Sequence, residues 1–291
     1  MARIIDGKII ANDILTEIKQ AVDRCTRPPH VVFIRVAEDP ASVIYVNRKQ
    51  KVAHEVGIRS TALAFPADVT STELLKAIDK LNRDPEVDGI LVQAPLPTEA
   101  MQRAAFLALD PQKDVDGFHP YNVGLLAQED GRGFVPCTPA GILELIRSTG
   151  QDFTGRHAVI LGRSSIVGKP MGMLLMQRKP WGNATVTFCH SKTRNIVHYT
   201  RGADLLVVAI GQPHFVTADM VKPGATVIDV GINRVPDPQR SKGYRVVGDV
   251  DFEHVQEVVD FITPVPGGVG PMTIAMLMKN TLLAYQRHAG C

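Results

Sequence analysis

A tyrosine and a lysine lie one helical turn apart in the first part of the chain. Tyr45 and Lys49 are four residues apart, a spacing that places both side chains on one face of a helix. Arg48 and Lys51 lie close by, and positive charge or burial beside an aromatic ring lowers the pKa of a lysine. A lysine that is partly neutral near pH 7 can act as a base. Most lysines on amphipathic helices are instead solvated, so the spacing alone leaves both interpretations open.

Three more polar side chains follow or interrupt apolar segments in the same half. Gln93 lies near the end of the apolar run that begins at Gly89, where a polar side chain needs a partner or a ligand. Asp114 and Asp116 belong to a loop rich in proline and glycine. We interpret Asp114 as a turn or capping residue. Asp116 could hold a polar heterocycle through paired hydrogen bonds.

The sequence does not indicate a metal site. The alternating aspartates are not followed by the further oxygen ligands of an EF-hand loop. The nine histidines form neither an HxxxH nor an HExxH pattern, and the four cysteines include no CxxC pair. We therefore expect no catalytic metal, no zinc site and no disulfide framework.

A glycine turn in the second half is typical of dinucleotide binding. The segment His157-Ala-Val-Ile-Leu-Gly162-Arg-Ser-Ser-Ile-Val-Gly168 reads as a strand, a tight turn and the start of a helix. In that context backbone N–H groups at the helix N-terminus can face a pyrophosphate. The motif departs from GxGxxG because Ser164 takes the place of the second glycine. By itself it could equally end a strand in any α/β protein.

The segment after the next strand predicts which nicotinamide cofactor is used. A site for NAD usually carries an acidic residue about 20 residues further on, which binds the ribose 2′-hydroxyl. No carboxylate occurs between Gly162 and Arg201, whereas Ser191, Lys192 and Arg194 supply a hydroxyl and two positive charges. These donors fit a 2′-phosphate. We therefore predict NADP, although Lys192 and Arg194 taken singly are also ordinary solvated residues.

Glycines follow the later predicted strands, where a doubly wound sheet binds its ligands. They are Gly211, Gly231, Gly267, Gly268 and Gly270. Residues 229–233 and 263–271 could line a flat pocket through their backbone. The alternative for the second segment is a helix entry loop with Pro271 near the first turn.

Alternating elements predict how these residues are positioned. In the first half we expect strands at 31–36, 62–65 and 89–92, and helices at 42–56, 70–81 and 98–108. Ser42 is the expected N-cap of the first of these helices, and Gly57 is the residue that ends it. The Glu38-Asp39-Pro40 segment is a break before it, and residues 110–139 are expected to form a long loop.

The second half repeats the alternation. A helix is expected at 140–147 and a linker at 150–155, followed by strands at 157–161, 185–188, 204–210, 225–230, 246–250 and 261–265. A helix at 271–287 ends the series. Alternation of this kind predicts α/β architecture with right-handed crossovers and parallel sheets. We therefore expect two α/β domains.

Composition excludes several other classes of protein. The chain has 291 residues, of which 45% are hydrophobic and 21% charged, an ordinary globular composition. The formal net charge of +2 is too small to favour nucleic acid or an anionic membrane as a partner. Apolar runs are far below the ~18 residues that span a bilayer. The first residues lack the apolar region of a secretory signal, so we expect a cytoplasmic enzyme.

The motifs, taken together and in order, resemble one known family over nearly the whole chain. They are Tyr45-Val-Asn-Arg-Lys49, Gly89-Ile-Leu-Val-Gln-Ala-Pro-Leu-Pro97, Lys113-Asp-Val-Asp-Gly-Phe-His-Pro120, Pro136-Cys-Thr-Pro139, Gly162-Arg-Ser-Ser-Ile-Val-Gly-Lys-Pro170 and Pro264-Val-Pro-Gly-Gly-Val-Gly-Pro-Met-Thr273. This set is similar to the bifunctional methylenetetrahydrofolate dehydrogenase/methenyltetrahydrofolate cyclohydrolase family.

The resemblance implies two linked reactions on tetrahydrofolate one-carbon derivatives. NADP-dependent oxidation converts 5,10-methylenetetrahydrofolate into 5,10-methenyltetrahydrofolate, and hydrolysis then gives 10-formyltetrahydrofolate, a role linked to purine biosynthesis. The implied organisation is a folate-binding catalytic domain at 1–140, completed by a C-terminal helix at 271–291. A Rossmann-type, doubly wound NADP-binding domain spans 141–270, with a cleft between the two domains. The family is typically a homodimer that associates through the cofactor domain.

The resemblance also implies roles for matching residues. Lys49 is the principal catalytic residue, Tyr45 stacks on the aminobenzoate group, Gln93 tunes Lys49, and Asp116 anchors the pterin ring. The implied substrate-binding set is Tyr45, Lys49, Val92, Gln93, Ala94, Asp116, Pro264, Val265, Pro266, Gly267, Gly268, Val269, Gly270, Pro271 and Met272. The implied NADP-binding set is Gly162, Arg163, Ser164, Ser191 and Ile232. No metal is implied.

Two positions depart from the family pattern, and three other functions stay open at this point. Ala94 replaces a usual leucine and Ala37 a usual glycine, both near the expected folate side. The alternatives are a monofunctional dehydrogenase, a shikimate- or amino-acid-type dehydrogenase of similar plan, and a cofactor-binding regulatory module without catalysis.

Overall fold

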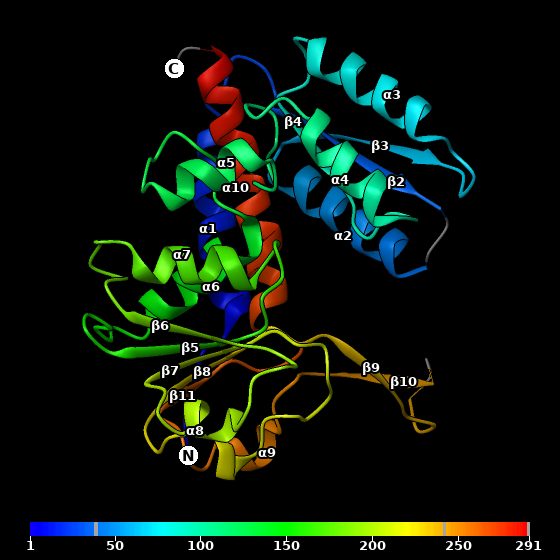
Figure 1. The fold of residues 1–291 in the computed structure, drawn as a ribbon. Coiled ribbons are helices and arrows are strands. Elements are labelled where there is room, and N and C mark those ends of the chain that lie inside the picture. Colours follow the sequence, from blue (N-terminus) through cyan, green and yellow to red (C-terminus); the bar gives the residue numbers. More distant parts are fainter. Residues whose placement is uncertain (38–39, 241–242, 290–291) are drawn as a thin grey trace. The chain divides into compact units, whose positions relative to one another are not determined.

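The computed structural model describes residues 1–37, 40–240 and 243–289 (Figure 1). The predicted break at Glu38 and Asp39 lies outside these ranges. The chain divides into two compact units, one made of residues 1–11 and 138–273 and the other of residues 12–137 and 274–291. The N-terminal residues, expected with the first domain, belong instead to the unit that holds residues 138–273. The reason is that β1 (Arg3–Ile4) pairs in parallel with β11 (Phe261–Ile262).

A three-stranded parallel sheet forms the centre of the unit that contains residues 12–137. Its order is β3 (Arg59–Phe65), β2 (His30–Val36) and β4 (Gly89–Val92). Helices α3 (Ser71–Arg83) and α4 (Glu99–Ala108) pack on one face, where alternate strand residues such as Ile34 meet helix residues such as Leu74. Both helices begin one residue after the predicted start, because Thr70 and Thr98 are N-caps whose side chains accept backbone N–H groups of the first turns.

The helix that carries Tyr45 and Lys49 begins earlier than predicted. Helix α2 spans Pro40–Glu55, so Ser42 lies within its first turn and the predicted N-cap is wrong. A proline has a fixed φ that suits the first helical position, which explains the earlier start. At the other end the prediction is confirmed, since Gly57 follows the helix with a φ of +82°.

The predicted long loop at 110–139 is partly helical. It contains α5 (Pro120–Ala127), and α6 (Cys137–Ser148) also begins inside it. Pro120 occupies the first turn of α5, and the His119 side chain accepts the N–H of Tyr121 at 3.0 Å. The proline that suggested a loop is therefore a helix start.

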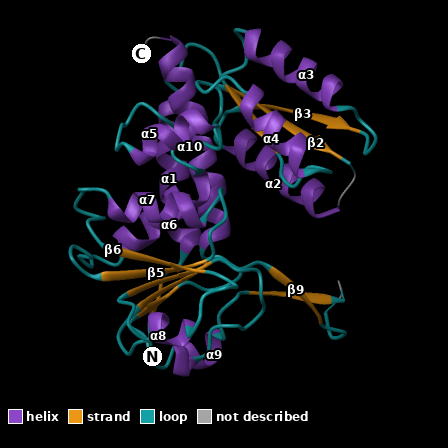
Figure 2. Cartoon of the chain, viewed as in Figure 1, coloured by secondary structure: helices purple, strands orange, loops and turns teal. Residues whose placement is uncertain are grey.

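The other unit holds a six-stranded parallel sheet. Its order is β1, β11, β8 (Thr226–Asp229), β7 (Leu205–Val208), β5 (His157–Leu161) and β6 (Thr185–Cys189). Helices α6 and α7 (Gly168–Met176) cover one face, and α8 (Ile196–Thr200) and α9 (Phe252–Val255) lie on the other (Figure 2). Since β6 and β7 flank β5 on opposite sides, the direction of winding reverses between β5 and β7. Ligands bind at such a reversal in doubly wound sheets.

A two-stranded antiparallel ribbon extends from one end of this sheet (Figure 1). It consists of β9 (Asn233–Pro236) and β10 (Tyr244–Val247). The predicted strand at 246–250 is therefore wrong in its bounds and its sheet. Residues 246 and 247 belong instead to the second strand of a hairpin, whose first strand, β9, is not predicted from the sequence.

Three remaining helices complete the description. They are α1 (Gly7–Val22), the short 3-10 helix η1 (Ala218–Met220) and α10 (Val269–Ala289). Helix α1 is not among the predicted elements, and α10 begins two residues before its predicted start at residue 271. Within the described ranges, no helix combines the length and apolar character needed to cross a membrane.

Candidate active site

Lys49 and Gln93 lie together, as the sequence resemblance implies. Lys49 projects from α2 and is only 8% exposed. Its Nζ donates a hydrogen bond to Oε1 of Gln93 at 2.9 Å. The amide of Gln93, which directly follows β4, donates through Nε2 to the carbonyl of Ala94 at 2.8 Å. The bond to Ala94 thus orients the Gln93 amide so that its oxygen faces Nζ of Lys49.

The pKa of Lys49 lies below the ordinary lysine value of 10.5, in the predicted direction. The cause is burial, which disfavours the ammonium form, while the Asp116 carboxylate and the Cys137 thiol act in the opposite sense. Arg48 and Lys51, suggested from the sequence as contributors, are exposed to solvent and are not among the causes. Lys49 is therefore a lysine whose neutral form is accessible.

The half-buried Asp116 and the buried Cys137 complete the group of titratable side chains that acts on Lys49. Burial raises the pKa of Asp116, whereas the charge of Lys49 and a hydrogen bond with Cys137 act to lower it. Burial and the Asp116 carboxylate raise the pKa of the Cys137 thiol well above its ordinary value, and its Sγ donates to the carbonyl of Val115 at 3.3 Å. No role for Cys137 follows from the sequence alone, although it belongs to the family motif Pro136-Cys-Thr-Pro139.

Asp114 stabilises the turn before α5, in agreement with the turn role that the sequence leaves open for it. It is fully buried, and its Oδ2 accepts the N–H of His119 at 2.7 Å and Nδ2 of Asn122 at 2.9 Å. These bonds tie the loop before α5 to the start of that helix. Asp114 therefore supports the segment that carries Asp116.

The other predicted folate contacts in this unit differ in accessibility. Tyr45 lies one turn before Lys49 on α2 and is half-buried. Ala94 is half-buried. Val92 is 2% exposed and packs in the core with residues of α3 and α4, so its side chain is not accessible to a ligand.

The glycine turn after β5 fits a dinucleotide. Gly162 has a φ of +115°, and a Cβ there would overlap the carbonyl oxygen of Ala209, which follows β7. A Cβ at Gly168 would overlap the carbonyl oxygen of Gly162. Both glycines are thus needed for close backbone approach at the point where the winding reverses.

The polar residues around this turn suit a phosphorylated ribose. Arg163 and Ser191 are exposed at the carboxyl ends of the adjacent strands β5 and β6, as are Lys192 and Arg194 further along the second loop. Ser164 is also exposed, but its Oγ accepts the N–H groups of Val167 at 3.1 Å and Gly168 at 3.3 Å. Two N–H groups expected to face a pyrophosphate are therefore capped by Ser164. The positively charged donor set fits a 2′-phosphate and so fits NADP.

The predicted segment 264–272 forms the entry into α10. Gly268 donates its N–H to the carbonyl of Pro264 at 2.8 Å, and Gly267 has a φ of +117°. A Cβ at Gly7 would overlap the carbonyl oxygen of Gly268, so the glycine pair lies against the start of α1. Pro271 lies in the first turn of α10. The segment belongs to the unit of the six-stranded sheet, whereas Lys49 belongs to the other unit.

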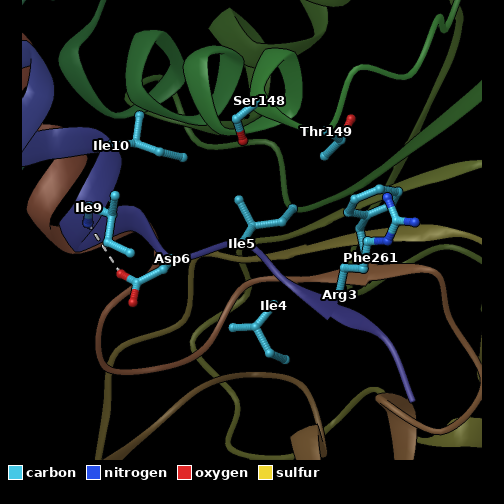
Figure 3. Close-up of a pocket in the computed structure, with 9 residues that line it drawn as sticks. All are labelled: Arg3, Ile4, Ile5, Asp6, Ile9, Ile10, Ser148, Thr149 and Phe261. Atoms are coloured by element: carbon cyan, nitrogen blue, oxygen red, sulfur yellow. Dashed lines mark hydrogen bonds between the residues drawn. The ribbon is translucent and has the colours of Figure 1, made fainter.

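A surface pocket at the edge strand β1 contains none of the predicted site residues. It is formed by β1, the start of α1, residues 148–149 and Phe261 (Figure 3). Its two charged residues are already engaged, since Arg3 lies over the Phe261 ring at 5.7 Å and Asp6 accepts the N–H groups of Lys8 and Ile9.

No cluster of three His, Cys, Asp or Glu side chains suited to a metal ion occurs within residues 1–37, 40–240 and 243–289.

A dinucleotide turn in one α/β unit and a buried, hydrogen-bonded lysine in the other define a two-domain dehydrogenase. Two family models match the chain: the catalytic domain of tetrahydrofolate dehydrogenase/cyclohydrolase at residues 5–116, and its NAD(P)-binding domain at residues 136–289. The chain belongs to the tetrahydrofolate dehydrogenase/cyclohydrolase family.

Individual relatives agree with this assignment over their whole length. The chain is 53% identical to the bifunctional protein FolD of Pelodictyon phaeoclathratiforme over 289 residues, which cover 98% of both chains. It matches the FolD crystal structure from Campylobacter jejuni with 43% identity, a TM-score of 0.91 and 99% coverage of both chains. It matches Trypanosoma brucei FolD, solved with NADP cofactor and an inhibitor, with 38% identity, a TM-score of 0.93 and coverage of 100% and 99%.

Proposed function

We propose that the chain is a bifunctional, NADP-dependent methylenetetrahydrofolate dehydrogenase and methenyltetrahydrofolate cyclohydrolase. It oxidises 5,10-methylenetetrahydrofolate to 5,10-methenyltetrahydrofolate and hydrolyses the product to 10-formyltetrahydrofolate. Family membership over the full chain supports both activities. Bound NADP supplies the hydride acceptor for the first step.

The observation that carries the hydrolytic activity is the buried contact between Lys49 and Gln93. Hydration of the methenyl cation needs a base that takes a proton from the attacking water. Neutral Lys49 donates one N–H to Gln93, which leaves its lone pair free to accept that proton. A cationic substrate nearby favours the neutral amine further.

The oxidative step makes a different demand on the protein. The lone pair of the folate nitrogen drives hydride departure, so the chain mainly has to position the two reacting carbons. We assign this positioning to Tyr45, whose ring would stack on the aminobenzoate group, and to Asp116, which would anchor the pterin. The two oxygens of Asp116 would form paired hydrogen bonds with the ring. Residues 264–272 would contact the folate mainly through their backbone.

We further propose a cytoplasmic homodimer that contributes to purine biosynthesis. The family resemblance supports the dimer, as does the exposure of Met176 and Phe188, 56% and 38% respectively, beside the edge strand β6. The buried thiols of Cys137 and Cys189 suit a reducing compartment. Light scattering of the purified chain tests the dimer directly, since a monomer mass would contradict it.

Assaying both steps on the purified protein tests the proposed function. We expect NADP-dependent formation of the methenyl product, followed by its hydrolysis in the absence of NADP. Oxidation without hydrolysis would favour a monofunctional dehydrogenase, and cofactor binding without either reaction would favour a regulatory module. Faster turnover with NAD than with NADP would contradict the 2′-phosphate assignment.

A further inference from the structure

Two buried aspartates face each other at the carboxyl end of the six-stranded sheet. Asp229, the last residue of β8, is 3% exposed, and Asp249, two residues after β10, is fully buried. Oδ1 of Asp229 accepts the N–H of Asp249, and its Oδ2 accepts the N–H of Val250, each at 3.0 Å. Burial raises the pKa of Asp229 to about 7 although backbone N–H groups donate to it, which reduces repulsion between the two carboxyls near neutral pH.

Each aspartate occupies space that only a glycine leaves open. A Cβ at Gly248, next to Asp249, would overlap Oδ2 of Asp229, and a Cβ at Gly231, near Asp229, would overlap the carboxylate of Asp249. The two Asp and Gly pairs thus interlock. This arrangement determines where the Asp249 carboxylate points.

Asp249 joins two segments that are far apart in the sequence. Its Oδ2 accepts the N–H groups of Ile210 at 2.8 Å and Gly211 at 2.9 Å, both in the turn after β7. Its Oδ1 accepts Nδ2 of Asn233, the first residue of β9, at 2.8 Å. A single carboxylate therefore fixes the turn after β7 and the start of the β9–β10 ribbon.

Both segments lie where the dinucleotide is expected. The turn after β7 begins at Ala209, whose carbonyl is in close approach to Gly162, and β5 and β7 flank the reversal of winding. Ile232, an implied NADP contact, is 52% exposed. Its two neighbours are held, Gly231 by an N–H donated to Asp229 at 2.9 Å and Asn233 by Asp249.

We propose that Asp249 is a positioning residue for the nicotinamide cofactor: it holds residues 210–211 and the segment around Ile232 in the arrangement that receives NADP. This inference rests on the proposed dehydrogenase function. Asp249 itself need not touch the cofactor. Its carboxylate acts through the hydrogen bonds that it accepts from the N–H groups of Ile210 and Gly211 and from the side-chain amide of Asn233.

The test variant is Asp249→Asn, in which one oxygen becomes an NH₂ group. That group must face either the N–H pair of residues 210–211 or the amide of Asn233, so one set of bonds is lost. We expect the dissociation constant of NADPH, measured by titration of its fluorescence, to rise at least tenfold. The KM for NADP should rise in parallel, with kcat changing less than threefold.

A charge-exchange variant separates positioning from general destabilisation. In the double variant Asp249→Asn/Asn233→Asp, the introduced amide can accept from residues 210–211 and donate to the introduced carboxylate. We expect NADPH affinity within about threefold of the wild type. Asp251→Asn is the matched control, because Asp251 lies two residues further on and its Oδ2 bonds to His254. It should bind NADPH as the wild type does.

The outcomes distinguish this inference from the proposed function. If Asp249→Asn does not fold, Asn233→Ala removes one of the three bonds and should weaken NADPH binding about threefold to fivefold. Wild-type NADPH affinity in both Asp249→Asn and Asn233→Ala would overturn the inference alone. So would an exchange variant that binds NADPH as weakly as Asp249→Asn and loses as much melting temperature. A wild type that fails to bind NADPH would instead overturn the dehydrogenase assignment.

Discussion

Lys49 and Gln93 are 44 residues apart in the sequence, yet Nζ of the lysine lies 2.9 Å from Oε1 of the glutamine. The hydrogen-bond partner of this buried lysine is therefore a neutral amide. An amide orients the amine without adding the negative charge that would hold its proton. The contact thus combines a fixed position with a lowered pKa, which is what a base for water attack requires.

Replacing Lys49 by methionine should abolish hydrolysis of the methenyl substrate. Methionine has similar length but no basic nitrogen, so the attacking water loses its proton acceptor. We expect the cyclohydrolase rate, followed by decay of the methenyl absorbance, to fall at least 100-fold. Oxidation should fall less, because it depends mainly on positioning.

Lys51→Met is the matched control for that variant. Lys51 lies on the same helix, and its side chain is 77% exposed beside Glu55. Its loss should leave both rates unchanged. Wild-type hydrolysis by Lys49→Met would refute the assignment of the base.

The cyclohydrolase rate should rise with pH through the pKa of Lys49. The base is the deprotonated amine, so activity is low below this pKa and high above it, and burial places the midpoint below 10.5. The Asp116 carboxylate acts to raise the same pKa. Asp116→Asn should therefore move the midpoint to lower pH, even if substrate affinity also falls.

This prediction is checked by pH profiles of kcat for the wild type and Asp116→Asn, after subtraction of the uncatalysed rate. Using kcat separates the titration from weaker substrate binding. A midpoint that stayed in place or moved upward in the variant would exclude Asp116 as a charge acting on Lys49.

The local sequence predicted much of the fold, because most elements carry their own start and stop signals. Gly57 ends its helix as predicted, and the helices expected from Thr70 and Thr98 begin within one residue of those positions, where each threonine is the N-cap. The placement of β1 depends on pairing with β11 at the other end of the chain. No periodicity within two residues could reveal such a pairing.

The candidate site shows the same division between local and distant information. Tyr45 and Lys49 share a helix face because of their spacing, whereas the contact with Gln93 came only from the family resemblance. Asp249 was not identified at all. Its partners at residues 210–211 and 233 are 16 or more residues away in sequence, and a buried carboxylate looks like any surface aspartate until the chain is folded.

Ala37→Gly should stabilise the protein. Ala37 has a φ of +66°, a left-handed conformation that costs a residue with a Cβ roughly 1–2 kcal/mol. Glycine avoids this cost but loses about 0.5–1 kcal/mol through greater freedom in the unfolded chain. We expect a net gain of about 0.5–1 kcal/mol in the free energy of unfolding, measured by urea denaturation.

Ala62→Gly is the matched control for Ala37→Gly, and we expect it to destabilise the protein. Ala62 is exposed on β3 and pairs with Phe33 of β2, in an extended conformation that alanine tolerates without strain. Here glycine should cost about 0.5–1 kcal/mol. Equal destabilisation by both variants would show that Ala37 carries no strain.

Ala94→Leu tests whether the folate pocket is wider than in the rest of the family. Ala94 follows Gln93 and accepts its side-chain N–H through the main-chain carbonyl, so the backbone contact is independent of the side chain. Additional apolar surface against the folate should lower its KM several-fold. An unchanged KM in steady-state assays would reject the widened pocket.

Asp88→Asn should destabilise the unit that contains the three-stranded sheet, and the effect should become smaller in acid. Asp88 is fully buried and accepts both terminal nitrogens of Arg27, at 2.7 and 2.8 Å, and the N–H of His30 at 2.8 Å. Burial alone raises the pKa of Asp88, but these bonds and one from His288 outweigh it and hold the pKa below 3.8. The carboxylate therefore stabilises the fold at pH values above the unfolded value, and this contribution is lost as pH falls through the lower folded value.

The measurement is urea denaturation of the wild type and the variant at neutral pH and near pH 3. At neutral pH we expect a loss of about 2–4 kcal/mol, because Arg27 is left without its anion although it is partly solvated. Near pH 3 the difference should shrink, since protonation weakens the wild-type contact as well. Asp79→Asn, which removes an exposed ion pair with Arg83, should change stability by less than about 0.5 kcal/mol at either pH. A constant difference between the wild type and Asp88→Asn across pH would mean that packing, and not the charge of Asp88, stabilises this region.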